Sequence, residues 1–299
     1  MSRYECRVDV DAVCAIDVHV HVEQDIDDQG SSHLSLDQEL MDASAAYFRS
    51  ADNRTPTVAD LATRYRAAGM AAVVFTVDAG TATGHRPLSS ERIAEQCAEH
   101  ADVLIPFGSV DPHRGASAAE QARRLVIEYG VRGFKFHPSL QGFAPDDKTY
   151  YPLWETIAEL GVPVLFHTGQ NGIGAGLPGG RGIKLRYSNP LLLDDIAADF
   201  PALNVILAHP SVPWQAEAIS MATHKANVFI DLSGWSPKYF PGELVRAAGG
   251  MLRHKVLFGS DYPLITPERW IEEFAGLGLK DSVLPGILKG NAARILPLC

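Results

Sequence analysis

Two histidines alternate with valines in the segment Ile16-Asp17-Val18-His19-Val20-His21-Val22. Side chains on a β-strand alternate between its two faces, so we expect Asp17, His19 and His21 on one face and the valines on the other. Imidazoles at positions i and i+2 of one strand can both reach a single metal ion at ~2.0–2.1 Å. The pattern therefore predicts a strand whose polar face binds a cation.

Further ionisable side chains stand at the ends of later apolar runs. They are His137, His167 and His209, each the last residue of its run, and Asp261, which follows the last run. One histidine at a strand end is equally well explained by a hydrogen bond to a nearby carbonyl, because histidine is often an ordinary, partly buried residue. The whole set is better explained by a metal site, provided that the strand ends converge in space.

The apolar runs recur with a regular rhythm. Each is followed by a loop, and a stretch with helical periodicity then leads to the next run. We predict eight strands, at Ala15–Val22, Ala71–Val77, Val103–Val110, Val131–His137, Val162–His167, Asn204–His209, Val228–Leu232 and Lys255–Ser260. Strands that alternate with helices pair in parallel through right-handed crossovers. The fold class is therefore α/β.

Eight strand–helix units in 299 residues match the size of a (β/α)8 TIM barrel, in which all strands converge on one mouth. A doubly wound open sheet is the alternative, but it would carry a glycine-rich turn after the first strand, and no glycine precedes Gly30. We predict one barrel domain over residues 1–299. A long insertion follows the first strand, from Glu23 to about Thr57, with a helix at Asp37–Phe48, and a second long loop covers Thr168–Pro190.

The composition is that of a folded protein without affinity for polyanions. Hydrophobic residues make up 46% of the chain and charged residues 21%, which excludes global disorder. A formal charge of −10 argues against binding to nucleic acid or to an anionic membrane. No apolar run approaches the ~20 residues of a membrane span, and the N-terminus lacks the pattern of a signal peptide. We expect a cytoplasmic protein.

The four cysteines are scattered along the chain and form no C-x-x-C pair. They are Cys6, Cys14, Cys97 and Cys299. This spacing excludes a structural zinc knuckle, and a chain of this length does not need a disulfide framework to fold. A metal site would therefore be built from the histidines and carboxylates.

Several segments together resemble the amidohydrolase superfamily. They are Asp17-Val18-His19-Val20-His21, Gly133-Phe134-Lys135-Phe136-His137-Pro138, Phe166-His167-Thr168-Gly169, Ala208-His209-Pro210, Phe258-Gly259-Ser260-Asp261-Tyr262-Pro263 and the closing Gly290-Asn291-Ala292-Ala293-Arg294-Ile295-Leu296. The resemblance is to the amidohydrolase-related branch, which includes the aminocarboxymuconate semialdehyde decarboxylase-like enzymes, and it spans residues 15 to 296. These motifs are specific to the superfamily but not to one reaction.

The resemblance implies a distorted barrel with a divalent metal at its mouth, zinc in first place and manganese as the alternative. By position, His19, His21, His167 and Asp261 would bind the metal. Asp261 would also take the proton of a metal-bound water, and His209 would act on water or substrate. In binuclear relatives a carboxylated lysine bridges two metals, and Lys135 stands on the matching strand. We favour a single ion, with Lys135 as a charge partner inside the barrel as the other interpretation.

Substrate contacts are expected from three places around the mouth. His137 and Lys135 lie two residues apart on the fourth strand, so both can face inward. Arg181 and Arg186, with Lys184 between them, form a basic loop that could bind a carboxylate, or could equally be a solvated surface. Trp235 follows the seventh strand and could line an aromatic pocket, although packing under a loop explains it as well.

These observations leave three functions open. The first is a metal-dependent hydrolase that acts, through a metal-activated water, on a carboxylated or CoA-linked intermediate of aromatic catabolism: a lactone, an ester or a β-keto acyl C–C bond. The alternative is a nonoxidative decarboxylase of a hydroxyaromatic or muconate-type acid. The third is a non-catalytic barrel, against which the intact ligand set argues. We expect a small anionic substrate and a homodimer.

Overall fold

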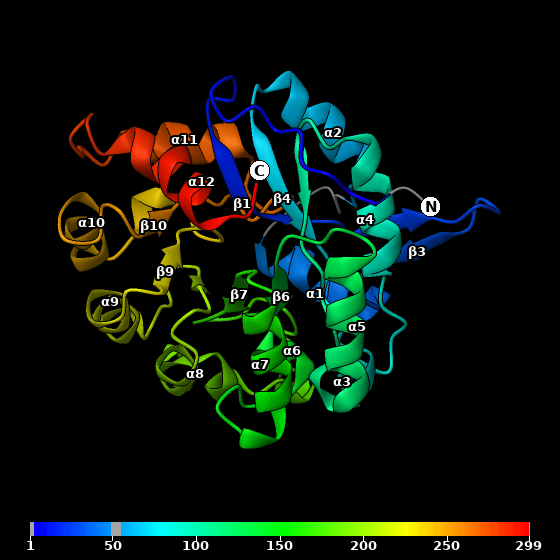
Figure 1. Cartoon of the computed structure of the whole chain (residues 1–299). Helices are drawn as coiled ribbons and strands as arrows, with labels where there is room; N and C mark the ends of the chain where they lie inside the picture. The colour runs from blue at the N-terminus through cyan, green and yellow to red at the C-terminus, as the bar shows by residue number, and fades with distance from the viewer. Residues whose placement is uncertain (1–2, 49–54, 299) are drawn as a thin grey trace.

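The structure is a computed structural model that describes residues 3–48 and 55–298; Cys299 and the middle of the predicted insertion lie outside these ranges (Figure 1). Its central strands occur where the sequence predicts them, with shorter ends. They are β1 (Ile16–His21), β4 (Ala71–Phe75), β5 (Leu104–Pro106), β6 (Phe134–Phe136), β7 (Val164–His167), β8 (Val205–Ala208), β9 (Val228–Asp231) and β10 (Val256–Leu257).

Two short bridges close these strands into a barrel. β1, β4 and β5 form one sheet, and a second sheet has the order β10-β9-β8-β7-β6. Gly108 pairs with Phe134 between β5 and β6, and Val20 pairs with Tyr262 between β1 and the segment after β10. Pairing within both sheets and at both bridges is parallel. The predicted (β/α)8 barrel is confirmed.

The outer helices alternate with the strands and surround them (Figure 1). They are α2 (Val58–Ala67), α4 (Ser90–Glu99), α5 (Ala116–Ile127), α7 (Tyr151–Glu159), α8 (Asp194–Asp199), α9 (Gln215–His224), α10 (Gly242–Gly249), α11 (Pro267–Ala275) and α12 (Asn291–Ile295). Shorter turns lie in the loops: α3 (Gly80–Thr83), α6 (Pro138–Gln141), 3-10 turns at Pro112–Arg114, Lys148–Tyr150, Pro178–Gly182, Leu185–Ser188, Pro190–Leu193 and Pro237–Tyr239, and a π-helical turn at Gly286–Gly290.

Apolar side chains fill two layers, one between barrel and helices and one inside the barrel. The inner cluster includes Val73, Ile105, Leu165, Ile206 and Leu257, all of them buried. Residues of the C-terminal segment, among them Ile295 and Leu298, pack against the same cluster. Apolar packing therefore fills the lower barrel, and the polar side chains of β1, β6 and β7 are left for its mouth.

An irregularity in β1 changes which residues share a face. The pairing of β1 with β4 shifts between Asp17 and Val20. Asp17 accepts a hydrogen bond from Tyr65 of α2 at 2.7 Å, whereas His19 lies against Lys135 inside the barrel. The prediction that Asp17 shares a face with His19 and His21 is therefore wrong, because a β-bulge interrupts strict alternation.

The insertion after β1 contains a hairpin that the sequence did not lead us to expect, and then the predicted helix. β2 (Gln24–Ile26) pairs antiparallel with β3 (Ser32–Leu34), and α1 (Gln38–Phe48) follows. At the turn, Asp27 Oδ1 accepts hydrogen bonds from the backbone N–H groups of Gln29 and Ser31. Asp-rich polar sequence thus forms a turn here, through side-chain to backbone bonding.

No helix among the described residues is both long and apolar enough to span a membrane.

The seam between β5 and β6 gives a stability prediction. A Cβ at Gly133 would overlap the ring of buried Phe107, which cannot move without disturbing the inner core. We expect Gly133→Ala to lower the free energy of unfolding by about 1–3 kcal/mol, as overpacked cores do. Gly290→Ala is the control, because Gly290 is helical and its nearest contact would be an ordinary 3.7 Å. Urea unfolding of both variants tests this, and equal midpoints would contradict it.

Candidate active site

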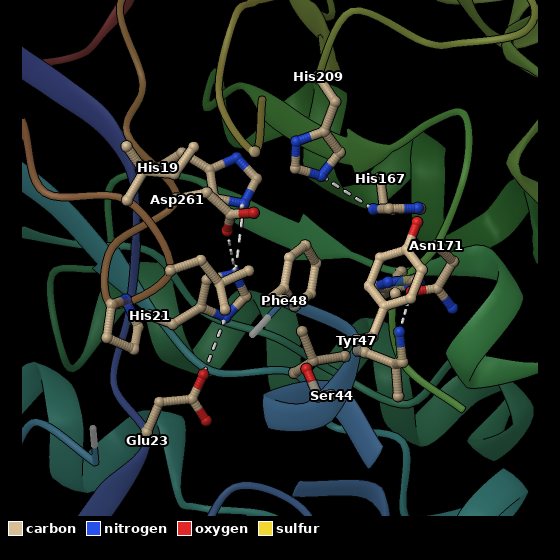
Figure 2. Close-up of a pocket in the computed structure, with 18 of the residues that line it drawn as sticks. His19, His21, Glu23, Ser44, Tyr47, Phe48, His167, Asn171, His209 and Asp261 are labelled. Carbon is tan, nitrogen blue, oxygen red and sulfur yellow. Dashed lines mark hydrogen bonds and ion pairs between the residues drawn. The ribbon is translucent and has the colours of Figure 1, made fainter. Parts of the chain in front are cut away.

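Three polar atoms converge at the mouth of the barrel, from β1 and from the segment after β10. His19 Nε2 and His21 Nε2 are 3.3 Å apart, and they lie 3.3 and 3.1 Å from Asp261 Oδ1. Figure 2 shows these side chains pointing toward one another. Atoms bound at ~2.0–2.2 Å to one ion in tetrahedral or octahedral geometry lie about 3.0–3.5 Å apart. The three are therefore spaced as ligands of one ion would be.

The hydrogen bonds of His19 leave its Nε2 without a proton. His19 Nδ1 lies 2.6 Å from Asp231 Oδ2, and an ionised carboxylate can only accept, so Nδ1 carries the hydrogen. The neutral imidazole then presents a lone pair at Nε2 toward the carboxylate of Asp261. Two electron-rich atoms in contact are stabilised by a cation between them, so this chemistry fits a metal ion.

A second pair of histidines comes from β7 and from the end of β8. His209 Nδ1 lies 3.1 Å from the carbonyl of Ser233, and His209 Nε2 lies 3.0 Å from His167 Nδ1. His167 Nε2 is buried and has no hydrogen-bond partner among the described residues. A buried polar atom without a partner costs about 1–3 kcal/mol. The atom therefore fits a role as a ligand to a group other than protein.

The structure brings the predicted ligands together. His19, His209 and Asp261 offer ligand atoms that lie within 4.8 Å of one another. His21 joins through its contacts with His19 and Asp261, and His167 joins through His209. His209, which we expected to lie beside the metal and act on water or substrate, is thus close enough to the cluster to be either a ligand or a neighbour of the ligands.

Burial keeps the imidazoles neutral. Removal from water lowers the pKa of His19, His167 and His209. Burial alone would raise the pKa of Asp261, but the neighbouring His19 and His21 outweigh it and hold that pKa well below its usual range. Neutral imidazoles beside an ionised carboxylate are the protonation states that metal binding requires.

Lys135 lies in the same cluster. Its Nζ is 3.2 Å from His19 Nε2 and 5.1 Å from the ring centre of Phe75, and the side chain is buried. Burial lowers the pKa of Lys135, against the attraction of Asp261 and Asp231. The lysine is therefore close enough to the ligands to contribute charge to them.

His137 stacks on His167, as their places on neighbouring strands allow. The two ring centres are 3.8 Å apart and the planes differ by 9°. The backbone N–H of Leu140 donates to His137 Nδ1 at 3.3 Å. His137 thus fixes the ring of His167 from one side and lines the cavity described next.

A cavity of about 480 Å³ lies above the cluster. Its lining includes Trp235, Lys135 and His137, as the sequence predicts. The sequence did not single out the following residues, which also line it: Glu23, Met41, Ser44, Tyr47, Phe48, Asn171 and Arg269. Most of these stand in the two long loops, and loop length was the one signal that pointed to them.

The basic loop does not line this cavity. Arg181 Nη1 lies 2.7 Å from Asp37 Oδ1 and 3.1 Å from Glu39 Oε2. Arg186 donates to the hydroxyl of Tyr187 at 3.3 Å and is exposed. The expectation that Arg181 and Arg186 contact the substrate is therefore not supported by their positions, because acidic and aromatic neighbours within the protein occupy both guanidinium groups.

Two site residues have an unusual backbone. His209 has φ 71° and Asp261 has φ 63°, values that L-residues seldom adopt. The backbone N–H of Asp261 donates to the carbonyl of His19 at 2.9 Å, which holds this conformation. Such strain persists where the surrounding structure determines it, and it gathers at functional sites.

The family model of the amidohydrolases matches residues 16–298. The chain therefore belongs to the amidohydrolase family. It is a metal-dependent enzyme of that superfamily, and the cluster of His19, His209 and Asp261 is its candidate divalent-metal site.

The chain is also similar to individual proteins, one by sequence and others by structure. Over 78 residues, 26% of this chain and 22% of the relative, it is 27% identical to a 2-amino-3-carboxymuconate-6-semialdehyde decarboxylase of Dictyostelium discoideum. A TIM-barrel protein of Bordetella bronchiseptica has a TM-score of 0.73 at 22% identity, with 94% of this chain and 97% of that chain covered. A dihydroxybenzoic acid decarboxylase of Polaromonas, with bound manganese and 2-nitroresorcinol, has a TM-score of 0.64 at 18% identity, with 95% and 96% covered.

Metal content tests the cluster directly. His19→Ala removes one ligand and leaves the Asp261 carboxylate without its partner, so we expect at least a tenfold loss of affinity for added manganese or zinc. His224→Ala, an exposed histidine of α9, should bind like wild type. Dialysis with each ion followed by elemental analysis makes the measurement. Equal metal content in the two variants would remove His19 from the site.

Gly234 offers a second test, because it packs directly on the cluster. It has φ +74°, and a Cβ there would overlap His209 Nδ1 and lie 2.9 Å from Asp261 Oδ2. We expect Gly234→Ala to fold but to bind metal more weakly, since both side chains must move. Thermal melting and metal titration together make the measurement, and wild-type metal affinity in a folded variant would contradict the expectation.

Proposed function

We propose that the protein is a metal-dependent, nonoxidative decarboxylase of a small hydroxyaromatic carboxylic acid. The observation that carries the proposal is the cavity of about 480 Å³, whose base holds the His–Asp–Lys cluster and whose walls include Met41, Phe48 and Trp235. An apolar wall above a few convergent polar groups suits a single aromatic ring with a polar edge. The named activities of the Dictyostelium and Polaromonas relatives support the same class of reaction.

The proposed reaction converts an aromatic carboxylate and a proton into the arene and carbon dioxide. The ring carbon that bears the carboxylate accepts a proton, and the C–C bond then breaks with its electron pair retained by the ring. We assign the transfer of that proton to Asp261 and His209, since both line the cavity; because Asp261 rests ionised and His209 rests neutral, each carries the proton only in transit to the ring carbon. The carbonyl of Ser233 orients His209 by accepting a hydrogen bond from Nδ1, so that Nε2 faces His167 Nδ1 at 3.0 Å.

The remaining polar groups of the cavity would bind the substrate. A divalent ion held by His19, His21, His167 and Asp261 would supply positive charge for the substrate's carboxylate and hydroxyl groups. Lys135 adds a buried positive charge, 3.2 Å from His19 Nε2. His137 would support the ring of His167, and Trp235 would contact the apolar part of the substrate.

Hydrolysis, which the sequence places first, has less support. The family match allows it, but the Dictyostelium and Polaromonas relatives are both named as decarboxylases. A barrel of this family can run either chemistry, because both use a metal that stabilises charge on an oxygen. The two functions differ in one product, because only the decarboxylase releases carbon dioxide from an acid.

The decisive experiment supplies the purified, manganese-loaded or zinc-loaded protein with carboxyl-labelled 2,6-dihydroxybenzoate and 5-carboxyvanillate. We expect labelled carbon dioxide and the decarboxylated phenol in equal amounts. A lactone and a β-keto thioester are included in parallel. Turnover of either of these without release of carbon dioxide from any acid would replace the decarboxylase by the hydrolase.

Asp261→Asn should retain part of the metal but lose most of the turnover. The amide oxygen can still coordinate weakly, whereas an amide cannot carry the proton, and removal of a general acid or base costs about 10²–10⁴ in rate. Asp281→Asn, at an exposed position, is the matched control and should react like wild type. If Asp261→Asn, once metal-loaded, retained full turnover, the proton would have to come from His209 instead.

A further inference from the structure

The two long loops of the chain pack against each other. Leu36, just before α1, belongs to an apolar cluster with Ile173 and Ile183 of the loop after β7. Val77, Ala79 and Leu140 form the buried part of that cluster. The segment before α1 and the loop after β7 thus pack on the same buried cluster.

Arg181 holds the same end of α1 by charge. Its guanidinium lies 2.7 Å from Asp37 Oδ1 and 3.1 Å from Glu39 Oε2. Asp37 Oδ1 also accepts the backbone N–H of Leu40 at 3.1 Å, so the carboxylate that caps the first turn of α1 is the one that Arg181 binds. A single arginine of the Gly-rich loop therefore contacts both acidic residues at the start of the helix.

The far end of α1 rests on the other end of that loop. Gln170 Nε2 donates to the hydroxyl of Tyr47 at 2.8 Å. The ring of Phe48 lies 2.5 Å from where a Cβ of Gly172 would be, so only glycine allows it to pack there. Both ends of α1 are thus held by the loop after β7.

Between these attachments, α1 covers the cavity. Met41, Ser44, Ala45, Tyr47 and Phe48 all line it. Figure 2 shows Ser44, Tyr47 and Phe48 facing the space above His21 and His167. Below the helix, Asn171 Nδ2 and His167 Nε2 are buried and have no hydrogen-bond partner among the described residues. These two polar atoms at the cavity therefore meet neither solvent nor a partner among the described residues.

We propose that Arg181 is a positioning residue that holds α1 as the roof of the cavity, and that Tyr47 and Phe48 in this roof determine which acids fit. The part about acids rests on the proposed decarboxylase function. Arg181 acts through Asp37 and Glu39 and contacts no substrate. We call the ion pairs of Arg181 with Asp37 and Glu39 the latch. The Arg181 side chain is 37% exposed, so these ion pairs are weak and α1 can move away from the cavity for each turnover.

Hydrogen exchange of the metal-loaded protein tests the latch without any substrate. In Arg181→Ala we expect the amides of residues 38–48 to exchange about two- to five-fold faster, the scale of one exposed ion pair. Arg186→Ala removes the same charge from the same loop and should leave these amides unchanged. Arg181→Lys should restore part of the protection, because it keeps the charge but not the two-pronged geometry.

The preference of the enzyme between two acids tests whether α1 determines which substrates fit. With 2,6-dihydroxybenzoate as the compact acid and 5-carboxyvanillate as the larger one, Phe48→Ala should shift the ratio of kcat/KM toward the larger acid. Arg181→Ala should raise KM for the compact acid several-fold and change kcat by less than two-fold, whereas Arg186→Ala changes neither. A fall in kcat alone would indicate a merely structural effect.

The outcomes separate this inference from the proposed function. Equal exchange of residues 38–48 in Arg181→Ala and Arg186→Ala overturns the latch, whatever reaction the enzyme catalyses. Faster exchange in Arg181→Ala alone supports it even if no acid releases carbon dioxide. In that case the decarboxylase proposal fails by itself, and the same KM comparison is made with whichever lactone or thioester is turned over. An unchanged acid preference in Phe48→Ala overturns the assignment of the roof as the determinant of selectivity.

Discussion

A buried carboxylate joins the first and last strands of the barrel. Asp17 accepts hydrogen bonds from the backbone N–H of Ser260 at 2.9 Å and of His19 at 3.1 Å, and from the hydroxyls of Ser260 and Tyr65. Burial raises the pKa of Asp17 to about 7 in spite of these bonds. The bonds fix the segment that leads to Asp261 against the strand that carries His19. His19 and Asp261 are 242 positions apart in sequence, so the distance between them depends on the hydrogen bonds of Asp17.

The strands, and the histidines and aspartate that gather at the mouth, could be predicted because both follow short-range patterns. His19, His167 and His209 each end or interrupt an apolar run, and barrel geometry then brings them to one mouth. The bulge in β1 could not be predicted, because it depends on hydrogen bonds from Ser260 and Tyr65, which lie far away in sequence. The partners of Arg181 could not be predicted for the same reason. Its positive charge suggested contact with a substrate anion, but Asp37 and Glu39 are also anions. Only the folded loops show that Arg181 pairs with these two carboxylates.

The site concentrates features that oppose stability. Asp231, Asp261 and Lys135 are buried charges, and His209 and Asp261 have strained backbones. Removing one charge partner from such a group is strongly destabilising, because the other is left without compensation. The apolar layer below, with Leu165 and Ile206, offsets this cost. The fold therefore tolerates a strained mouth because the base of the barrel is well packed.

The two long loops explain how one barrel can be made selective without changes to its metal ligands. The candidate ligands stand on strands or just after strand ends, whose positions are set by the closed sheet, whereas the upper cavity is lined by α1 and the loop after β7. Gly172 and Arg181 connect these two loops, so a substitution in one of them alters the position of the other. A change in either loop can therefore reshape the upper cavity while the cluster of His19, His209 and Asp261 beneath it keeps its geometry.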